Sequence, residues 1–92
     1  DENIPKVTKL NNSYPNPFNA VTTLSYSLAE ESEVKLDIFN LLGQRVETLF
    51  DTHQKPGEYS INWDASSVSS GVYFYKLSTC EKVFTKRMTL LK

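Results

Sequence analysis

The sequence predicts an all-β domain, either a sandwich or a barrel. Short runs of alternating apolar and polar residues recur at a spacing of roughly 8–12 residues, with turn-forming residues between them. No segment of useful length shows the period of a helix. Aromatic residues, which favour strands, make up 12% of the 92 residues. A chain of this length suits one domain and leaves no room for a second core.

The expected strands follow one another along most of the chain. Residues 1–12 are polar and predict a linker or a loosely attached first strand, ahead of a domain over residues 13–92. Further strands are expected at residues 21–28, 34–39, 44–50, 58–64, 71–77 and 83–91. Alternation places three groups of residues on core-facing sides, namely Thr22, Leu24, Tyr26 and Leu28, then Val34, Leu36 and Ile38, then Tyr59, Ile61 and Trp63.

Turn residues separate these strands. Residues 40–43 reverse the chain, with Gly43 as the expected left-handed residue, so strands 34–39 and 44–50 are predicted to form a hairpin. Lys55-Pro56-Gly57 is a second strong turn signal. Trp63 is expected to fill the core.

One stretch, Tyr14-Pro15-Asn16-Pro17-Phe18-Asn19, is unusually specific. Each proline fixes φ, removes a backbone donor and pushes the preceding residue toward extended geometry. The segment is therefore stiff and is neither helix nor interior strand. We expect its two rings to anchor it to the core and its asparagines to hydrogen-bond to the local backbone.

Composition excludes several classes of protein. The net charge of -1 argues against a nucleic-acid-binding domain. No apolar run approaches the ~20 residues of a membrane span. No signal peptide opens the chain, so the export signal of an exported protein is expected upstream or of another kind. The single cysteine, Cys80, cannot form an internal disulfide and is expected to be an incidental free thiol.

The sequence indicates no catalytic, cofactor-binding or metal-binding residue. The one histidine, His53, is expected in a polar turn, and no serine lies in a Gly-x-Ser-x-Gly turn. No cysteine or histidine cluster has zinc spacing, and no acidic loop suggests tight calcium binding. Side-chain oxygens near Asn16, Asn19 or Asp64 are the remaining candidates for a structural cation.

Two surface patterns point to binding instead. Phe39, Phe74 and Phe50 alternate opposite the expected core residues, which leaves a sugar-binding face as one interpretation. The last eleven residues hold four basic residues and no acid, which fits either a solvated edge strand or a docking strip for an acidic receptor. The residues assigned to partner binding in this tail are Lys86, Arg87, Met88, Leu90 and Lys92, with Met88 and Leu90 alternating toward the core.

Taken together, the motifs resemble a known family. Residues 14–19 precede the strand at 22–28, and Leu42-Gly43-Gln44-Arg45-Val46 follows a hydrophobic strand. The further matching positions are Gly57, Tyr59 and Trp63, then Ser70 to Tyr75 with Gly71 and Tyr73, and finally Arg87-Met88-Thr89-Leu90-Leu91-Lys92. In this order the chain resembles the C-terminal sorting domain, type A, of the type IX (Por) secretion system of Bacteroidetes.

The resemblance implies an immunoglobulin-like antiparallel β-sandwich of about seven strands at the end of a larger exported protein. It implies that the domain binds partners and need not catalyse a reaction. The implied partners are an outer-membrane type IX translocon, a sortase-like cell-surface protease and an N-terminal cargo domain of the same precursor. The expected route runs through the periplasm to the cell surface or the medium, with Lys92 as the precursor's last residue. Two alternatives remain, a carbohydrate-binding or accessory module retained on a secreted hydrolase, and a structural spacer like the sandwich domain of flagellar hook-capping proteins.

Overall fold

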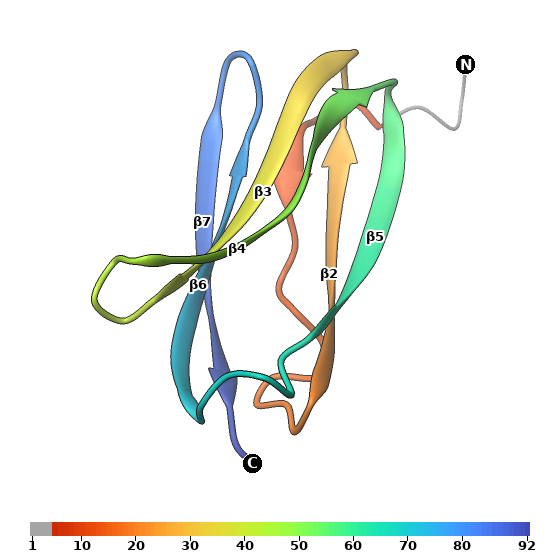
Figure 1. Cartoon of the computed structure of the whole chain (residues 1–92). Helices are drawn as coiled ribbons and strands as arrows, with labels where there is room; N and C mark the ends of the chain where they lie inside the picture. The colour runs from red at the N-terminus through yellow and green to blue at the C-terminus, as the bar shows by residue number, and fades with distance from the viewer. Residues whose placement is uncertain (1–4) are drawn as a thin grey trace.

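Seven antiparallel strands in two facing sheets make up residues 5–92, the part of the chain that the computed structural model describes (Figure 1). Residues 1–4, which belong to the linker expected at 1–12, lie outside the described residues. The strands are β1 (Lys9–Leu10), β2 (Val21–Leu28), β3 (Ser32–Asn40), β4 (Arg45–Gln54), β5 (Gly57–Asp64), β6 (Gly71–Ser78) and β7 (Val83–Leu90).

The sheets have the orders β1-β2-β5 and β4-β3-β6-β7. Hairpins join β3 to β4 and β6 to β7, whereas the chain passes from one sheet to the other between β2 and β3, between β4 and β5, and between β5 and β6. Two sheets that each bury one face against the other form a sandwich. The all-β sandwich expected from the sequence is therefore confirmed, and residues 5–92 contain no helix.

The core lies between the sheets and follows the period of two. The core-facing residues expected in β2 and β3 are at most 2% exposed, and Trp63 on β5 is equally buried. Tyr59 and Ile61 share the inner side of β5 but are only half-buried. The second half of the chain contributes Tyr73, Tyr75 and Leu77 from β6, and Met88 and Leu90 from β7.

Strand β4 departs from the expected pattern because two bulges interrupt its pairing with β3. The register shifts between Leu36 and Asp37 and between Ile38 and Phe39, which leaves Val46 and Leu49 without a partner on β3. The shifts turn Phe50 inward, where its ring stacks on Tyr26 at a centroid distance of 5.6 Å. The prediction that Phe50 lies on the outer side is therefore wrong.

Two buried tyrosine hydroxyls of the core have hydrogen-bond partners. Tyr26 donates its hydroxyl hydrogen to Gln54 Oε1, and burial, opposed by this hydrogen bond, raises the pKa of Tyr26 to about 12. Tyr75 donates to the carbonyl oxygen of Asn11 at 2.8 Å, and burial also raises its pKa. Because a buried hydroxyl without a partner is costly, these bonds fix how the two sheets and the N-terminal segment fit together.

Candidate recognition surface

Strand β7 carries most of the residues that the sequence assigns to partner binding. It is the last strand of the four-stranded sheet. Met88 and Leu90 are fully buried, whereas Arg87 points to the opposite, outer side and is exposed. Lys86 lies on the same side of the strand as Met88 and is half-buried. The tail therefore joins a buried apolar anchor to basic side chains that reach the surface.

The segment Tyr14–Asn19 lies along the free edge of β7. Asn16 Nδ2 donates to the carbonyl oxygen of Arg87 at 3.3 Å, and Thr89 N donates to Asn16 Oδ1 at 3.0 Å. Phe18 N donates to Thr89 O at 2.9 Å, and Leu91 N donates to Phe18 O at 2.8 Å. Two motifs more than 70 residues apart in the sequence are thus one structural unit.

The aromatic rings and the asparagines of this segment behave differently from expectation. Phe18 is 2% exposed and anchors the segment, but Tyr14 is 80% exposed and does not. Asn16 hydrogen-bonds across to β7 rather than to the local backbone. The edge of a sheet offers unpaired backbone groups, and Asn16 can satisfy a donor and an acceptor there at once. The expectation of local bonding is therefore wrong for Asn16, and of the two rings expected to anchor the segment only Phe18 does so.

Lys92 is held by the loop that connects β5 to β6. Its backbone N–H donates to Ser70 Oγ at 3.0 Å, and its Nζ donates to the carbonyl oxygen of Ser66 at 2.8 Å. The Ser66 N–H donates to Asp64 Oδ1 at 3.0 Å. This hydrogen bond, followed by one from the Ser66 side chain and by the charge of Lys92, holds the pKa of the Asp64 carboxyl below its usual value. Lys92 is exposed, yet its position is defined.

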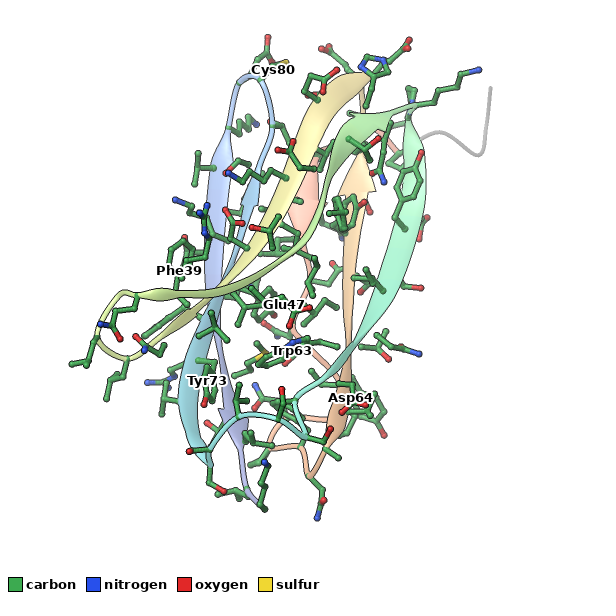
Figure 2. The ribbon with its side chains drawn as sticks, viewed as in Figure 1. Phe39, Glu47, Trp63, Asp64, Tyr73 and Cys80 are labelled. Carbon is green, nitrogen blue, oxygen red and sulfur yellow. The ribbon has the colours of Figure 1, made fainter. Side chains whose placement is uncertain are left out.

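Trp63 is buried in the core and contacts aromatic residues from two of the sequence motifs (Figure 2). Its ring lies 5.9 Å from that of Phe18 and 5.6 Å from that of Tyr73, measured between centroids. Its Nε1 donates to Glu47 Oε1 at 3.0 Å, as a buried indole requires. Trp63 therefore fills the core, as expected, and its ring also packs against that of Phe18.

The family model for the secretion system C-terminal sorting domain, of the type IX system, matches residues 12–90. The chain belongs to this family. No curated protein matches it in sequence.

A solved structure has the same fold as this sorting domain. The chain is similar to dimeric latent PorU from Porphyromonas gingivalis, with a TM-score of 0.70 at 18% sequence identity. The similarity covers 92% of the sorting domain and 9% of the PorU chain. At this identity the likeness concerns the fold, and it agrees with the immunoglobulin-like sandwich that the resemblance implied.

The glycines of the sorting-domain motifs occupy positions that suit glycine. Gly43 has a φ of 83°, so the expected left-handed residue of the β3–β4 turn is confirmed. Gly57 and Gly71, with φ of 156° and 153°, begin β5 and β6. A Cβ added to Gly57 would lie 3.7 Å from the ring of Tyr59, and one added to Gly71 would meet nothing within 4 Å.

His53 lies in strand β4 of the sorting domain, not in a polar turn as expected. The strand runs to Gln54 because Ser32 to Leu36 of β3 continue to pair with its end. The ring lies between two carboxylates, with Nε2 2.6 Å from Glu31 Oε2 and Nδ1 2.9 Å from Glu33 Oε2. The hydrogen bond with Glu31, and after it the one with Glu33, raises the pKa of His53 above its ordinary value.

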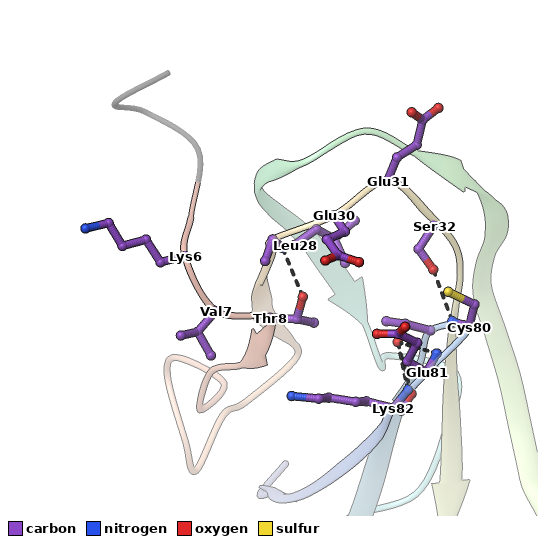
Figure 3. A pocket seen from close by; sticks show the side chains of 12 residues that line it. Lys6, Val7, Thr8, Leu28, Glu30, Glu31, Ser32, Cys80, Glu81 and Lys82 are labelled. Atoms are coloured by element: carbon purple, nitrogen blue, oxygen red, sulfur yellow. Dashed lines mark hydrogen bonds between the residues drawn. The ribbon is translucent and has the colours of Figure 1, made fainter.

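A pocket of about 250 Å³ lies where the N-terminal segment meets two turns (Figure 3). Exposed Cys80 lines it, and the Cys80 backbone N–H donates to Ser32 Oγ at 3.1 Å. Residues 5–92 contain no group of three or more histidine, cysteine, aspartate or glutamate residues placed to hold a metal ion. Over the same residues, no helix has the length and apolar character to cross a membrane.

Proposed function

We propose that this domain directs a larger protein through the type IX outer-membrane translocon to the cell surface or the medium. Its family membership over residues 12–90 carries this proposal. The geometry supports it, because the first and last motifs are hydrogen-bonded to each other along β7, with basic side chains at the surface. The cargo would be an N-terminal part of the same precursor, passing through the periplasm.

The domain would act by being recognised and would itself catalyse no reaction. Sorting-domain families are generally non-catalytic, and the proposed partners are the translocon and a sortase-like cell-surface protease. The chain spans only 9% of the PorU chain that it resembles, which fits a module attached to a much larger protein.

Some of the tail residues would serve folding and others would serve recognition. Met88 and Leu90 are fully buried and position the strand. Arg87 and Lys92 are exposed, and Lys86 is half-buried, so these cations are proposed to contact the secretion machinery. Since exposed charges contribute little to folding, about 0–1 kcal/mol per pair, the two roles can be separated by substitution.

The test is export of a fluorescent protein fused ahead of the domain in a bacterium with a type IX system. Replacing Lys86, Arg87 and Lys92 with alanine should leave the melting temperature nearly unchanged and lower the exported fluorescence. The matched control replaces three exposed lysines outside β7 and the tail with alanine, namely Lys6, Lys9 and Lys55. Export of the tail variant at the level of this control would contradict the proposed role of the tail.

A carbohydrate-binding module retained on a hydrolase is the second candidate. Phe39 and Phe74 do lie half-buried on an outer sheet face, which favours it. However, Lys76 Nζ lies 5.1 Å from the centroid of the Phe39 ring, over the face on which a sugar would stack. Retention on insoluble polysaccharide that is lost in Phe39→Ala and Phe74→Ala would support this candidate over sorting.

A further inference from the structure

The outer face of the four-stranded sheet carries a continuous row of four side chains, one from each strand. The register pairs Arg45 of β4 with Phe39 of β3, Phe39 with Phe74 of β6, and Phe74 with Arg87 of β7. Residues directly opposite one another across a sheet project to the same face. We call these four residues the arginine–phenylalanine row.

The row is open to solvent and strongly cationic. Arg45 and Arg87 are exposed, and both phenylalanines are half-buried although no described segment packs over this face. In the next row, Lys76 places its Nζ over the Phe39 ring, and its register partner Asp37 is only 4% exposed. Asp37 accepts a hydrogen bond from Thr48 Oγ1 at 2.6 Å, so this carboxylate is occupied within the sheet. The part of the face around the row thus presents three cations and no exposed acid.

The exposed acids of this face begin two residue pairs away from the row, where Asp51 of β4 lies opposite Lys35 of β3. Two further acids lie at the far end of the face. Glu33 and His53 are paired across β3 and β4, and Glu31 reaches the same histidine from the adjoining turn. The chain as a whole has a net charge of -1, so the positive region reflects placement and not composition. Because positive charge is concentrated around the row, the row should attract a partner whose surface is negatively charged.

The turn next to the row adds exposed apolar surface. Leu41 and Leu42, at the tip of the β3–β4 hairpin, are 68% and 82% exposed. Figure 1 shows this hairpin projecting beyond the body of the sandwich, and Figure 2 places Phe39 near its base. Asn40 Oδ1 accepts hydrogen bonds from Leu42 N at 2.9 Å and Gln44 N at 3.0 Å, which brace the tip. The leucines are therefore displayed on a defined turn.

We infer that the arginine–phenylalanine row is a docking surface for a protein partner whose surface carries carboxylates beside apolar side chains. Guanidinium groups bind carboxylates through paired hydrogen bonds, and arginine and aromatic residues are enriched where protein interfaces concentrate their binding energy. This inference rests on the proposed sorting function, and it places the contact on the sheet face in addition to the tail.

The test uses the passenger fusion with two substitutions outside the tail set, Arg45→Glu and Phe74→Ser. Export should fall by about tenfold or more, because a reversed charge opposite a carboxylate is repelled at an interface. The matched control, Lys55→Glu with Val21→Ser, changes one exposed cation and one exposed apolar residue away from this face and should export normally. Melting temperatures identify any variant that fails to fold, in which case Arg45→Glu alone replaces the pair.

A photocrosslinking residue at Thr85, which is exposed in the row next to Arg87, identifies the partner. A protease-sensitive adduct to a carboxylate-rich protein segment, lost in the Arg45→Glu variant, supports the inference. An adduct to a polysaccharide, an adduct to a second copy of this chain, or no adduct during active export overturns it. Normal export of the Arg45→Glu, Phe74→Ser variant also overturns it and leaves the sorting function standing, whereas an unmodified fusion that is not exported refutes the sorting function itself.

Discussion

His53 is held between two glutamate carboxylates, each within hydrogen-bond distance of one ring nitrogen. The protonated ring donates to both, whereas the neutral ring has only one N–H to donate. Its side chain is 51% exposed, so solvent weakens the interaction without removing it. The arrangement ties the turn before β3 to the end of β4 in a way that depends on pH.

The pKa of His53 should therefore lie above 6.5 in the folded domain. Its contribution to stability is present in full below 6.5, while the two glutamates stay ionised, and is lost as pH rises through the raised pKa. Because the chain has one histidine, its ring resonances in an NMR titration report this value directly. Glu31→Gln with Glu33→Gln should return the pKa toward 6.5, and an unmodified domain with a pKa of 6.5 or below would contradict the assignment.

Gly43 illustrates a residue whose identity is set by backbone conformation alone. Its φ is 83°, and a Cβ added there would meet nothing within 4 Å. Gly43→Ala should lower the free energy of unfolding by roughly 1 kcal/mol, which is the cost of left-handed backbone for a residue with a Cβ. Gly43→Asn should cost less, since asparagine tolerates this conformation. Equal stability of the three proteins in chemical denaturation would show that the turn does not need glycine.

At the scale of the element, β7 depends on the segment Tyr14–Asn19 along its edge. Asn16→Ala removes the bonds to Arg87 O and Thr89 N, and should cost roughly 1 kcal/mol and speed amide hydrogen exchange at Thr89. Asn19→Ala, in the same segment, is the control, since no side-chain hydrogen bond of Asn19 occurs among the described residues. Unchanged protection of Thr89 in the Asn16 variant would mean that the segment only lies beside β7 without holding it.

The elements also show where sequence reasoning succeeds and where it stops. Period-two alternation predicts the buried sides of β2 and β3, because neither strand carries an extra residue; the two extra residues of the β3–β4 pairing lie on β4. It misplaces Phe50 because the bulges at Val46 and Leu49 shift the alternation of β4, and neither of these residue types indicates a bulge. It also missed the partners of Asn16, which lie 71 and 73 residues away and depend on how the sheets assemble.

Alternation and charge predict the tail residues, and the structure adds the surface next to them. Alternation separated buried Met88 and Leu90 from exposed Arg87. The row that Arg87 forms with Phe39, Phe74 and Arg45 cannot be predicted from the sequence, since it depends on the register of all four strands. Residues that meet across a sheet cannot be paired from one sequence until the strand order is known.

For the molecule as a whole, the last strand is as much a part of the core as any other. Deleting Met88 to Lys92 removes two fully buried side chains, each worth roughly 1.5–3 kcal/mol, and uncovers the core around Trp63. The deletion also removes the pairing of these residues with β6 and their backbone hydrogen bonds with Phe18. The combined loss is comparable to a total stability on the order of 5–15 kcal/mol, so the domain should be unfolded at 25 °C by circular dichroism. Deleting only Leu91 and Lys92 should leave it folded, and a folded product of the longer deletion would show that β7 is dispensable.

The whole domain is proposed to be a signal that the secretion machinery recognises and that performs no chemistry of its own. The most direct measurement compares the exported fluorescence of one passenger protein with and without residues 5–92, in a bacterium with an active type IX system and in a matched strain lacking the translocon. We predict export only when the domain and the translocon are both present. Equal export of the passenger without the domain would contradict the account.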